Sequence, residues 1–133
     1  MYLSAPINSI FPPTIVVSEA EAKITLEVKP EYFNAADAIH GAVYFKLLDD
    51  SAVFAASSCN EKFVVLTASF TTDISKPVSS GLVTAIGKVV KTDGKKLYAE
   101  SIMHDEHGNE VAKGHGLFLP CKMRFKDLDC YQA

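Results

Sequence analysis

The stretch from residue 40 to residue 58 constrains the fold of this chain more than any other. It contains no proline and only one glycine, Gly41, near its start. Its apolar residues cover most of the circumference of a helix: Val43, Leu47, Leu48, Ala52, Val53, Phe54, Ala55 and Ala56. A helix that is apolar on nearly all sides is normally buried. We therefore predict one central helix, about 28 Å long at 1.5 Å per residue, which the rest of the chain must cover.

The segments before this helix have the features of strands. Residues 14–19 are apolar and β-branched, and residues 23–29 alternate between polar and apolar side chains. Such alternation indicates a strand with one buried and one solvated face. Residues 34–37 then suit a loop, in which Asp37 is a candidate helix cap.

The sequence after the helix predicts a series of antiparallel strands. The expected strands are residues 63–74, 78–91, 97–104 and 111–119, with tight turns at 92–95 and 107–109. In the first strand, alternation assigns one face to Val64, Leu66, Ala68, Phe70 and Ile74, and the other to Thr67, Ser69, Thr71 and Asp73. Strands in this order around one long helix form an α+β architecture. One helix cannot cover five or six strands, so the remaining sheet surface predicts self-association.

Length and composition limit the domain count and the partners. The 133 residues fit a single domain, 1–133, with residues 1–13 as an irregular or short helical arm and 120–133 as a tail. The net charge is −3, and lysines are spread among acidic residues, so no nucleic acid is expected. No apolar run approaches the ~18 residues of a membrane helix. No lysine precedes Lys23, which leaves no basic segment of a secretory signal, so we expect a cytoplasmic protein.

Asp49 is the residue of the expected helix that is hardest to explain structurally. Most of its neighbours at helical spacing are apolar, and burying a carboxylate costs several kcal/mol unless it is paired or used. Lys46 could pair with it, but Lys46 also precedes Asp50 by four residues, which is the better helix pair. Asp50 therefore has a structural explanation. Asp49 is a candidate functional residue, because perturbed carboxylates cluster at functional sites.

His40 and Gly41 stand at the expected start of the helix. The first N–H groups of a helix have no partner within it and favour negative charge, so Gly41 could supply an oxyanion hole. Alternatively, Gly41 only permits a tight helix entry and His40 is a surface residue. Gly41 and Asp49 would lie about 12 Å apart along the axis. If both are catalytic, the active site therefore combines two subunits across a dimer interface.

Other candidate residues carry weaker signals. His104, Asp105 and His107 resemble metal ligands but fall at a turn without a further ligand, so no metal is expected. Three scattered cysteines, Cys59, Cys121 and Cys130, suit neither a disulfide framework nor a zinc site. Four glycines in the expected strand region indicate bulges or close approaches, and some could let a ligand lie against the sheet: Gly81, Gly87, Gly114 and Gly116.

The spacing of several of these residues resembles a known family. Asn34 precedes His40-Gly41 by six residues, and Asp49 follows His40 by nine. Lys76-Pro77 stands where the family commonly has Arg-Pro, and a Val-Ala-Lys-Gly run in the last expected strand resembles the family's Val-Ala-x-Gly ending. From residue 15 to 118 the chain resembles the hotdog-fold acyl-CoA thioesterases of the phenylacetate-pathway (PaaI-like) type. This implies an antiparallel sheet wrapped around one central helix.

The resemblance also implies a role for each matched residue. Asp49 would act as general base on water or as a nucleophile, the Gly41 amide would polarise the thioester carbonyl, and His40 would support that turn. Asn34 would orient the water or the carbonyl, and Thr67 could hold the water. Family members are dimers, usually paired into tetramers, and use no cofactor besides the coenzyme A of the substrate. The candidate CoA-contacting residues are Lys76, Lys88, Lys91, Lys113 and Gly81.

Two other functions stay open. One is an acyl-CoA-binding hotdog protein without catalysis, and the other is a hotdog hydratase or dehydratase in which His40 and Asp49 meet across subunits. The acyl group is not specified by the sequence. Five aromatic residues could line an aryl or medium-chain pocket or belong to the core: Tyr44, Phe45, Phe54, Phe63 and Phe70.

Overall fold

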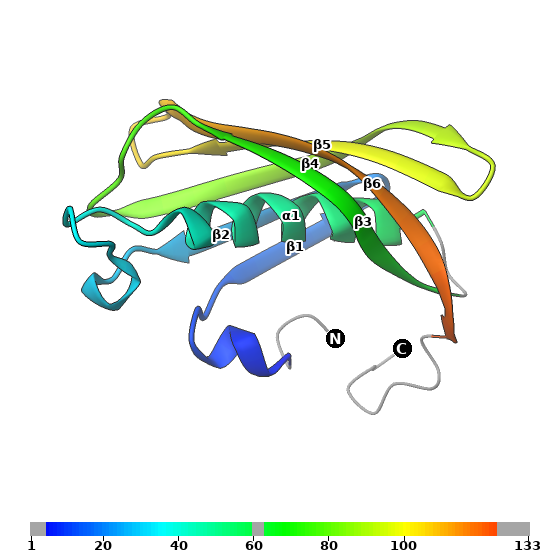
Figure 1. Cartoon of the computed structure of the whole chain (residues 1–133), viewed down its shortest axis with the longest axis horizontal. Coiled ribbons are helices and arrows are strands. Elements are labelled where there is room, and N and C mark those ends of the chain that lie inside the picture. Colours follow the sequence, from blue (N-terminus) through cyan, green and yellow to red (C-terminus); the bar gives the residue numbers. More distant parts are fainter. Residues whose placement is uncertain (1–4, 60–62, 125–133) are drawn as a thin grey trace.

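The structure, a computed structural model, describes residues 5–59 and 63–124. Within these residues the chain forms two short 3₁₀ helices, one α-helix and six strands (Figure 1). Their bounds in chain order are η2 Pro6–Ser9, β1 Thr14–Ser18, β2 Glu21–Glu27, η3 Pro30–Tyr32, α1 Gly41–Ser57, β3 Phe63–Ile74, β4 Leu82–Asp93, β5 Lys96–His104 and β6 Glu110–Arg124. The predicted central helix and the predicted strands are therefore confirmed, with shifts at some ends.

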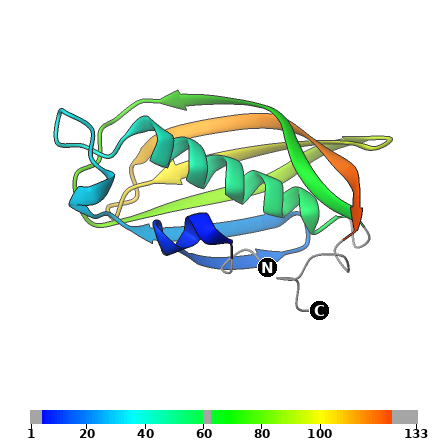
Figure 2. The same ribbon diagram turned by 60° about the horizontal axis from the view of Figure 1, so that its bottom comes forward.

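The six strands form one antiparallel sheet in the order β1-β2-β4-β5-β6-β3. Figure 2 shows α1 lying across the concave face of this curved sheet, with β3 at one edge and β1 at the other. The α+β prediction is confirmed. No helix in the described part of the chain is long and apolar enough to cross a membrane.

The core lies between α1 and the concave face of the sheet. Fully buried helix residues such as Leu47 and Leu48 pack against Ile24, Val83 and Met103 of the sheet. At Gly87 the backbones of β4 and α1 come so close that a Cβ atom there would collide with the backbone of Ser51 and Ala52. The expectation that strand glycines mark close approaches is therefore confirmed for Gly87, and this contact fixes the helix against the sheet.

The helix begins one turn later than an Asp37 cap would require. Asp37 has a φ of 59° and lies in a turn closed by the Asn34 N–H, which donates to the Ala38 carbonyl at 2.7 Å. The N-cap is His40 instead, whose ring accepts a hydrogen bond from the Ala42 N–H. The prediction of Asp37 as the cap was wrong, because the chain completes a separate turn before α1 starts.

The predicted faces of β3 are correct only in part. Thr67 pairs with Phe118 and Ser69 pairs with Leu117, so Ala68 is an extra residue in a β-bulge. At the bulge, two adjacent residues of β3 oppose one residue of β6. The side chains before the bulge therefore point to the opposite faces of the sheet from those that simple alternation predicts. Thr67 therefore faces the helix, whereas Leu66 is 54% exposed, contrary to the alternation.

Two segment boundaries also differ from those expected. Strand β4 begins at Leu82 rather than at residue 78, after Gly81 with its φ of 87°. Strand β6 continues to Arg124, so residues 120–124 of the predicted tail are strand, and residues 125–133 lie outside the described part. In the predicted N-terminal arm, residues 6–9 form the short helix η2, in agreement with the expected short helical arm. Residues 1–4 of the arm lie outside the described part.

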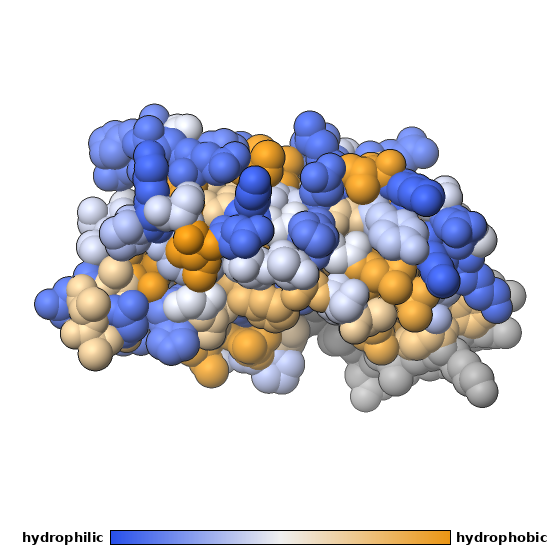
Figure 3. Space-filling model, turned by 45° about the horizontal axis from the view of Figure 1, so that its top comes forward, coloured by the Kyte–Doolittle hydropathy of each residue, from blue (hydrophilic) through white to orange (hydrophobic). Residues whose placement is uncertain are grey.

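The sheet surface that faces away from α1 is mixed in character. Figure 3 shows apolar side chains there scattered among polar ones. Among the exposed apolar side chains are Leu82, Val90 and Ile102 on the strands β4 and β5. Strand β3 lies at the edge of the sheet, where its outer backbone groups find no partner strand within the described chain. Both features leave room for the expected self-association, which stays a prediction.

Candidate active site

One stripe of α1 runs alongside β3 in the opposite direction. The stripe repeats every four residues and consists of Gly41, Phe45, Asp49, Val53 and Ser57. Its first part lies near the C-terminal end of β3, where Gly41 and Ile74 line the same cavity. Its middle contacts the bulge, where Asp49 meets Thr67. The helix and the strand edge therefore carry three of the predicted site residues, Gly41, Asp49 and Thr67, along one line.

Asp49 lies in a partly desolvated position with one hydrogen-bond donor. The hydroxyl Oγ1 of Thr67 donates to Oδ1 of Asp49 at 2.7 Å. Burial raises the pKa of Asp49, the bond from Thr67 opposes that rise, Asp50 adds to it, and Lys46 opposes it weakly. A carboxylate with these perturbations next to a cavity is typical of a functional site. The structure brings Thr67 to Asp49, and it does so through the bulge at Ala68.

Asp50 has the structural role that its spacing predicted. The Lys46 ammonium lies 2.7 Å from Oδ2 of Asp50, in an i,i+4 ion pair. The same ammonium donates to Oδ1 of Asn8 at 2.7 Å and so connects α1 to η2. Lys46 is therefore engaged away from Asp49. This difference separates the two adjacent carboxylates, because only Asp49 borders the cavity next to β3.

The start of α1 presents one backbone donor. Nδ1 of His40 accepts from the Ala42 N–H at 2.9 Å, and the His40 carbonyl accepts from the Val43 N–H at 2.9 Å. The N–H of Gly41 donates to no group in the described chain. The geometry of His40 thus supports the turn, and the free Gly41 amide at the positive end of the helix dipole can bind an oxyanion.

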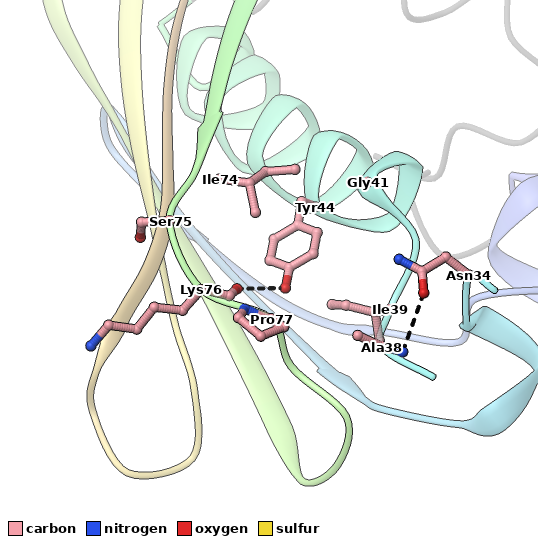
Figure 4. Close-up of a pocket in the computed structure, with 9 residues that line it drawn as sticks. All are labelled: Asn34, Ala38, Ile39, Gly41, Tyr44, Ile74, Ser75, Lys76 and Pro77. Carbon is pink, nitrogen blue, oxygen red and sulfur yellow. Dashed lines mark hydrogen bonds between the residues drawn. The ribbon is translucent and has the colours of Figure 1, made fainter. Parts of the chain in front are cut away.

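A cavity of about 260 Å³ opens beside this helix start, and we call it the Gly41 cavity. Its lining includes Asn34, Gly41, Tyr44, Ile74, Lys76 and Pro77 (Figure 4). Oδ1 of Asn34 accepts from the N–H groups of Ala36 and Ala38 at 2.8 and 3.4 Å, so this side chain shapes the loop before the helix. The structure brings Asn34 and Gly41 together, as the motif spacing predicted.

Tyr44 fixes the opposite wall of the Gly41 cavity. Its hydroxyl donates to the Lys76 carbonyl at 2.8 Å, which connects α1 to the segment between β3 and β4. Burial raises the pKa of Tyr44, so the phenol stays a donor at neutral pH. In Figure 4 the ammonium of Lys76 points away from Gly41 and Tyr44. The sequence identified Tyr44 only as a possible pocket or core aromatic, because its partner is a backbone carbonyl that no sequence pattern marks.

A second cavity of about 260 Å³, the Asp49 cavity, lies farther along the same stripe. Asp49 and Thr67 line it together with Val53, Phe54, Val64 and Leu66. It shares no lining residue with the Gly41 cavity. Between the two, Phe45 of α1 packs on Phe70 of β3, with ring centroids 5.6 Å apart. Within one chain, Gly41 and Asp49 therefore line separate cavities.

Comparison with known proteins identifies the family. The sequence pattern of the thioesterase superfamily matches residues 37–112, more than half of the chain. The chain belongs to the thioesterase superfamily. Among curated proteins, no match was found.

Solved structures of this type share the fold. The PaaI protein from the phenylacetic acid degradation operon of E. coli superposes with a TM-score of 0.85 at 19% identity, covering 93% of this chain and 90% of that one. A putative esterase from Mycobacterium tuberculosis gives 0.82 at 21%, covering 90% and 99%. A mutant of the phenylacetic acid degradation protein PaaI from Thermus thermophilus gives 0.80 at 18%, covering 88% and 100%. The predicted hotdog fold is thereby confirmed.

The expected CoA-contacting residues of this superfamily member are dispersed. Lys76 lines the Gly41 cavity, but the other four candidates line neither of the two cavities. Lys88 borders a third cavity with Glu100 and His104, and the Lys91 ammonium lies 5.6 Å from the ring centroid of Tyr98. The structure also separates Lys113, which is exposed on β6, from Gly81, over which the Glu106 carboxylate lies. Contact of these five residues with CoA stays a prediction, and only Lys76 lines one of the two cavities named above.

The weaker candidates have local roles in the described structure. Asp105 accepts from the N–H groups of His107 and Asn109, both at 2.9 Å, and so closes the turn between β5 and β6. The backbone donor at Asn109 is the main cause of a lowered pKa at Asp105. Cys59 is exposed at the end of α1, with Sγ 3.8 Å from the Ala55 carbonyl oxygen. Among the described residues, no group of three or more potential ligands is arranged for a metal ion.

Proposed function

We propose that this protein hydrolyses an acyl-CoA thioester to a free acid and CoA, with Asp49 as the catalytic carboxylate. The observation that carries the proposal is the partly buried Asp49, which holds a hydrogen bond from Thr67 and borders a cavity. Membership of the thioesterase superfamily supports the hydrolase chemistry. The CoA is part of the substrate, and the reaction needs no separate cofactor.

The proposed reaction uses one base and one oxyanion donor. The Asp49 carboxylate takes a proton from water as the water oxygen attacks the thioester carbonyl carbon. The carbonyl oxygen becomes an oxyanion that accepts a hydrogen bond from the Gly41 N–H. When the carbonyl re-forms, the C–S bond breaks and the CoA thiolate leaves with its electron pair. In the nucleophilic variant, Asp49 attacks the carbonyl directly, and water then hydrolyses the resulting mixed anhydride.

A homodimer would bring the two halves of this site together. Asp49 is level with Thr67 on β3, and Gly41 is level with Ile74 at its other end. If two β3 edges paired antiparallel about a twofold axis near Phe70, the Thr67 end of one strand would lie opposite the Ile74 end of the other. Asp49 of one subunit would then approach Gly41 of its partner. This arrangement removes the separation of about 12 Å within one helix.

The first test is thiol release from a panel of short, medium, long and aryl acyl-CoAs. Asp49→Asn should lower kcat by orders of magnitude while the oligomer stays intact. Asp50→Asn is the matched control, because the Asp50 carboxylate pairs with Lys46 instead of facing the cavity. Activity retained in Asp49→Asn, or lost only in Asp50→Asn, would contradict the assignment.

The second test concerns the shared site. Asn34→Ala removes the side chain that shapes the loop before Gly41, so it should inactivate the Gly41 half of the site. Asn34→Ala and Asp49→Asn chains, unfolded and refolded together, should then recover part of the wild-type activity, because mixed dimers contain one site with neither change. Each variant refolded alone is the control. Mixed dimers that form, as detected with differently tagged chains, yet stay inactive would refute the two-subunit site.

The alternative functions have less support. A hydratase needs His40 as an acid or base at the substrate; Nδ1 of His40 is engaged as the helix cap, so only Nε2 is left for that role. A protein that only binds acyl-CoA gains nothing from a partly desolvated carboxylate such as Asp49, because the charge costs free energy without a return in affinity. The tetramer and the cytoplasmic location stay predictions.

A further inference from the structure

The carboxylate next to Asp49 has its own counterion. Asp50 follows Asp49 directly on α1, and two neighbouring carboxylates disfavour each other's ionisation. The Lys46 ammonium lies 2.7 Å from Oδ2 of Asp50 and offsets that charge. The side chains of Lys46 and Asp50 are only 10% and 20% exposed, so solvent and salt screen their charges little. The position of this ammonium therefore affects the charge that Asp49 experiences.

The N-terminal arm helps to hold the ammonium in that position. Asn8 of η2 is 4% exposed, and its Oδ1 accepts a hydrogen bond from Nζ of Lys46 at 2.7 Å. A lysine side chain is long and flexible, and its ammonium has three donors to satisfy. Two acceptors on different elements, Asn8 on η2 and Asp50 on α1, restrict the ammonium to one place.

We propose that Asn8 is a positioning residue for Asp49, which holds the Lys46 ammonium against Asp50 and so cancels the negative charge next to Asp49. The inference rests on the proposed function, because it specifies how the N-terminal arm controls the charge of the proposed catalytic carboxylate. Asn8 does not line the Asp49 cavity, so its effect passes through Lys46 and Asp50.

The groups that face Asp49 within the described chain support this role. Burial raises the pKa of Asp49, the Thr67 hydroxyl lowers it, Asp50 raises it and Lys46 lowers it. Strand β3, which packs against this part of α1, contributes the neutral Thr67, and the other side chains that line the Asp49 cavity are uncharged. Asp50 and Lys46 are therefore the charges that act on Asp49 from the described chain, and they act in opposite directions.

The arm has a second attachment that does not involve Asn8. The hydroxyl of Tyr32 in η3 donates to the Ile10 carbonyl at 3.0 Å. The ring of Tyr32 also packs on that of Phe11, with ring centroids 4.8 Å apart. A substitution at Asn8 should therefore leave the arm docked, and the contact with Lys46 can be tested separately from the arm as a whole.

The experiment measures the pKa of Asp49 by carbon-13 NMR of its side-chain carboxyl group, with the signal assigned by its loss in Asp49→Asn. The same variants are assayed for kcat/KM with one acyl-CoA across pH. Asn8→Ala should raise the pKa of Asp49, which leaves less carboxylate at acidic pH and lowers kcat/KM there by about twofold to threefold. Lys46→Met removes the cation and should lower it further, by about fivefold to tenfold. At alkaline pH the curves should meet.

Three controls separate the electrostatic effect from damage to the fold. Ser9→Ala removes a hydrogen bond within η2, from Oγ of Ser9 to the Pro6 carbonyl, and should leave the pKa of Asp49 unchanged. Lys46→Arg keeps the cation and should keep the wild-type pH profile. Adding Asp50→Asn to Lys46→Met removes both charges, so the pKa should return toward the wild-type value. A structural defect would not be reversed by this second substitution.

Two outcomes would overturn the inference. One is a pKa of Asp49 that does not change in Asn8→Ala, and the other is a shift in Lys46→Met that Asp50→Asn does not reverse. If Asn8→Ala does not fold, Asn8→Leu tests the same prediction, because leucine has a similar size and no acceptor.

The NMR titration needs no turnover, so it separates this inference from the proposed function. If the wild type hydrolyses no thioester but Asn8→Ala raises the pKa of Asp49, the proposed function fails and the positioning role of Asn8 stands. If hydrolysis depends on Asp49 but the pKa is the same in Asn8→Ala and the wild type, the proposed function stands and the positioning role fails.

Discussion

The hydrogen bond between Thr67 and Asp49 allows a direct test of the electrostatics of the site. Thr67 Oγ1 donates to Asp49 Oδ1 at 2.7 Å, and this bond opposes the rise in the pKa of Asp49 that burial causes. Thr67→Val keeps the shape of the side chain and removes the donor. We expect the pKa of Asp49 to rise further, because the ionised carboxylate loses a stabilising partner while its burial is unchanged.

The size of the effect follows from the exposure of the pair. A hydrogen bond to a charged group contributes about 1.5–3 kcal/mol, and solvent around the exposed Thr67 reduces this to about 1 kcal/mol. Because about 1.4 kcal/mol corresponds to a factor of ten, the ionisation equilibrium of Asp49 should change about fivefold. On the acidic limb of the pH profile, kcat/KM of Thr67→Val should therefore fall about fivefold relative to the wild type.

The assay is kcat/KM for one acyl-CoA measured across pH. Thr67→Ser is the control, since it keeps the hydroxyl and should keep the acidic limb in place. At alkaline pH Asp49 is ionised in every variant, so the curves should meet there; a lower plateau for Thr67→Val would mean that Thr67 also holds the attacking water. An acidic limb that does not move, or that moves to lower pH, refutes the reasoning.

Three further predictions concern stability, measured by urea denaturation. The raised pKa of Asp49 means that the folded chain binds a proton at this carboxylate more tightly than the unfolded chain does. Asp49→Asn should therefore stabilise the protein slightly at pH 8, by less than about 1 kcal/mol, and the difference in unfolding free energy from the wild type should vanish near pH 3. A difference that grows as the pH falls would contradict this prediction. Gly87→Ala should lower the free energy of unfolding by about 1–3 kcal/mol or more, because a Cβ there collides with the helix backbone. The control is Gly94→Ala, where a Cβ meets no atom within 4 Å and only the positive φ of 61° costs about 1 kcal/mol. Tyr44→Phe should cost about 0.5–1.5 kcal/mol by leaving the Lys76 carbonyl without its donor; an unchanged midpoint would show that this bond does not contribute.

The elements that depend on local patterns were predictable from the sequence. The apolar circumference of residues 40–58 predicted α1, and alternation and turn residues predicted the strands. Asp49 could be selected from the sequence because burying a carboxylate among apolar positions costs free energy unless it is paired or used. Lys46 had a better-spaced partner in Asp50. In these cases the information lies within a few residues of the chain.

The features that depend on distant partners were not predictable. The bulge at Ala68 arises from the register with β6, and both possible alternations of β3 contain apolar residues. The side of Thr67 therefore could not be known, although its identity as a hydroxyl residue could. His40 as the cap, rather than Asp37, depends on the turn that closes between Asn34 and Ala38. The dispersal of the lysines follows from sheet order, which the sequence does not specify.

The contact at Gly87 has a mechanical consequence. The backbone of β4 lies directly against the backbone of Ser51 and Ala52, with no layer of side chains between them. The helix therefore cannot slide along the sheet or turn about its axis without moving the sheet, and it acts as a spacer that holds the two cavities at a fixed separation. Both cavities border this spacer, so neither can adapt to a ligand by a hinge motion of α1. Adaptation has to come from side-chain rotation, or from the connections at residues 33–40 and 75–81 that close the Gly41 cavity.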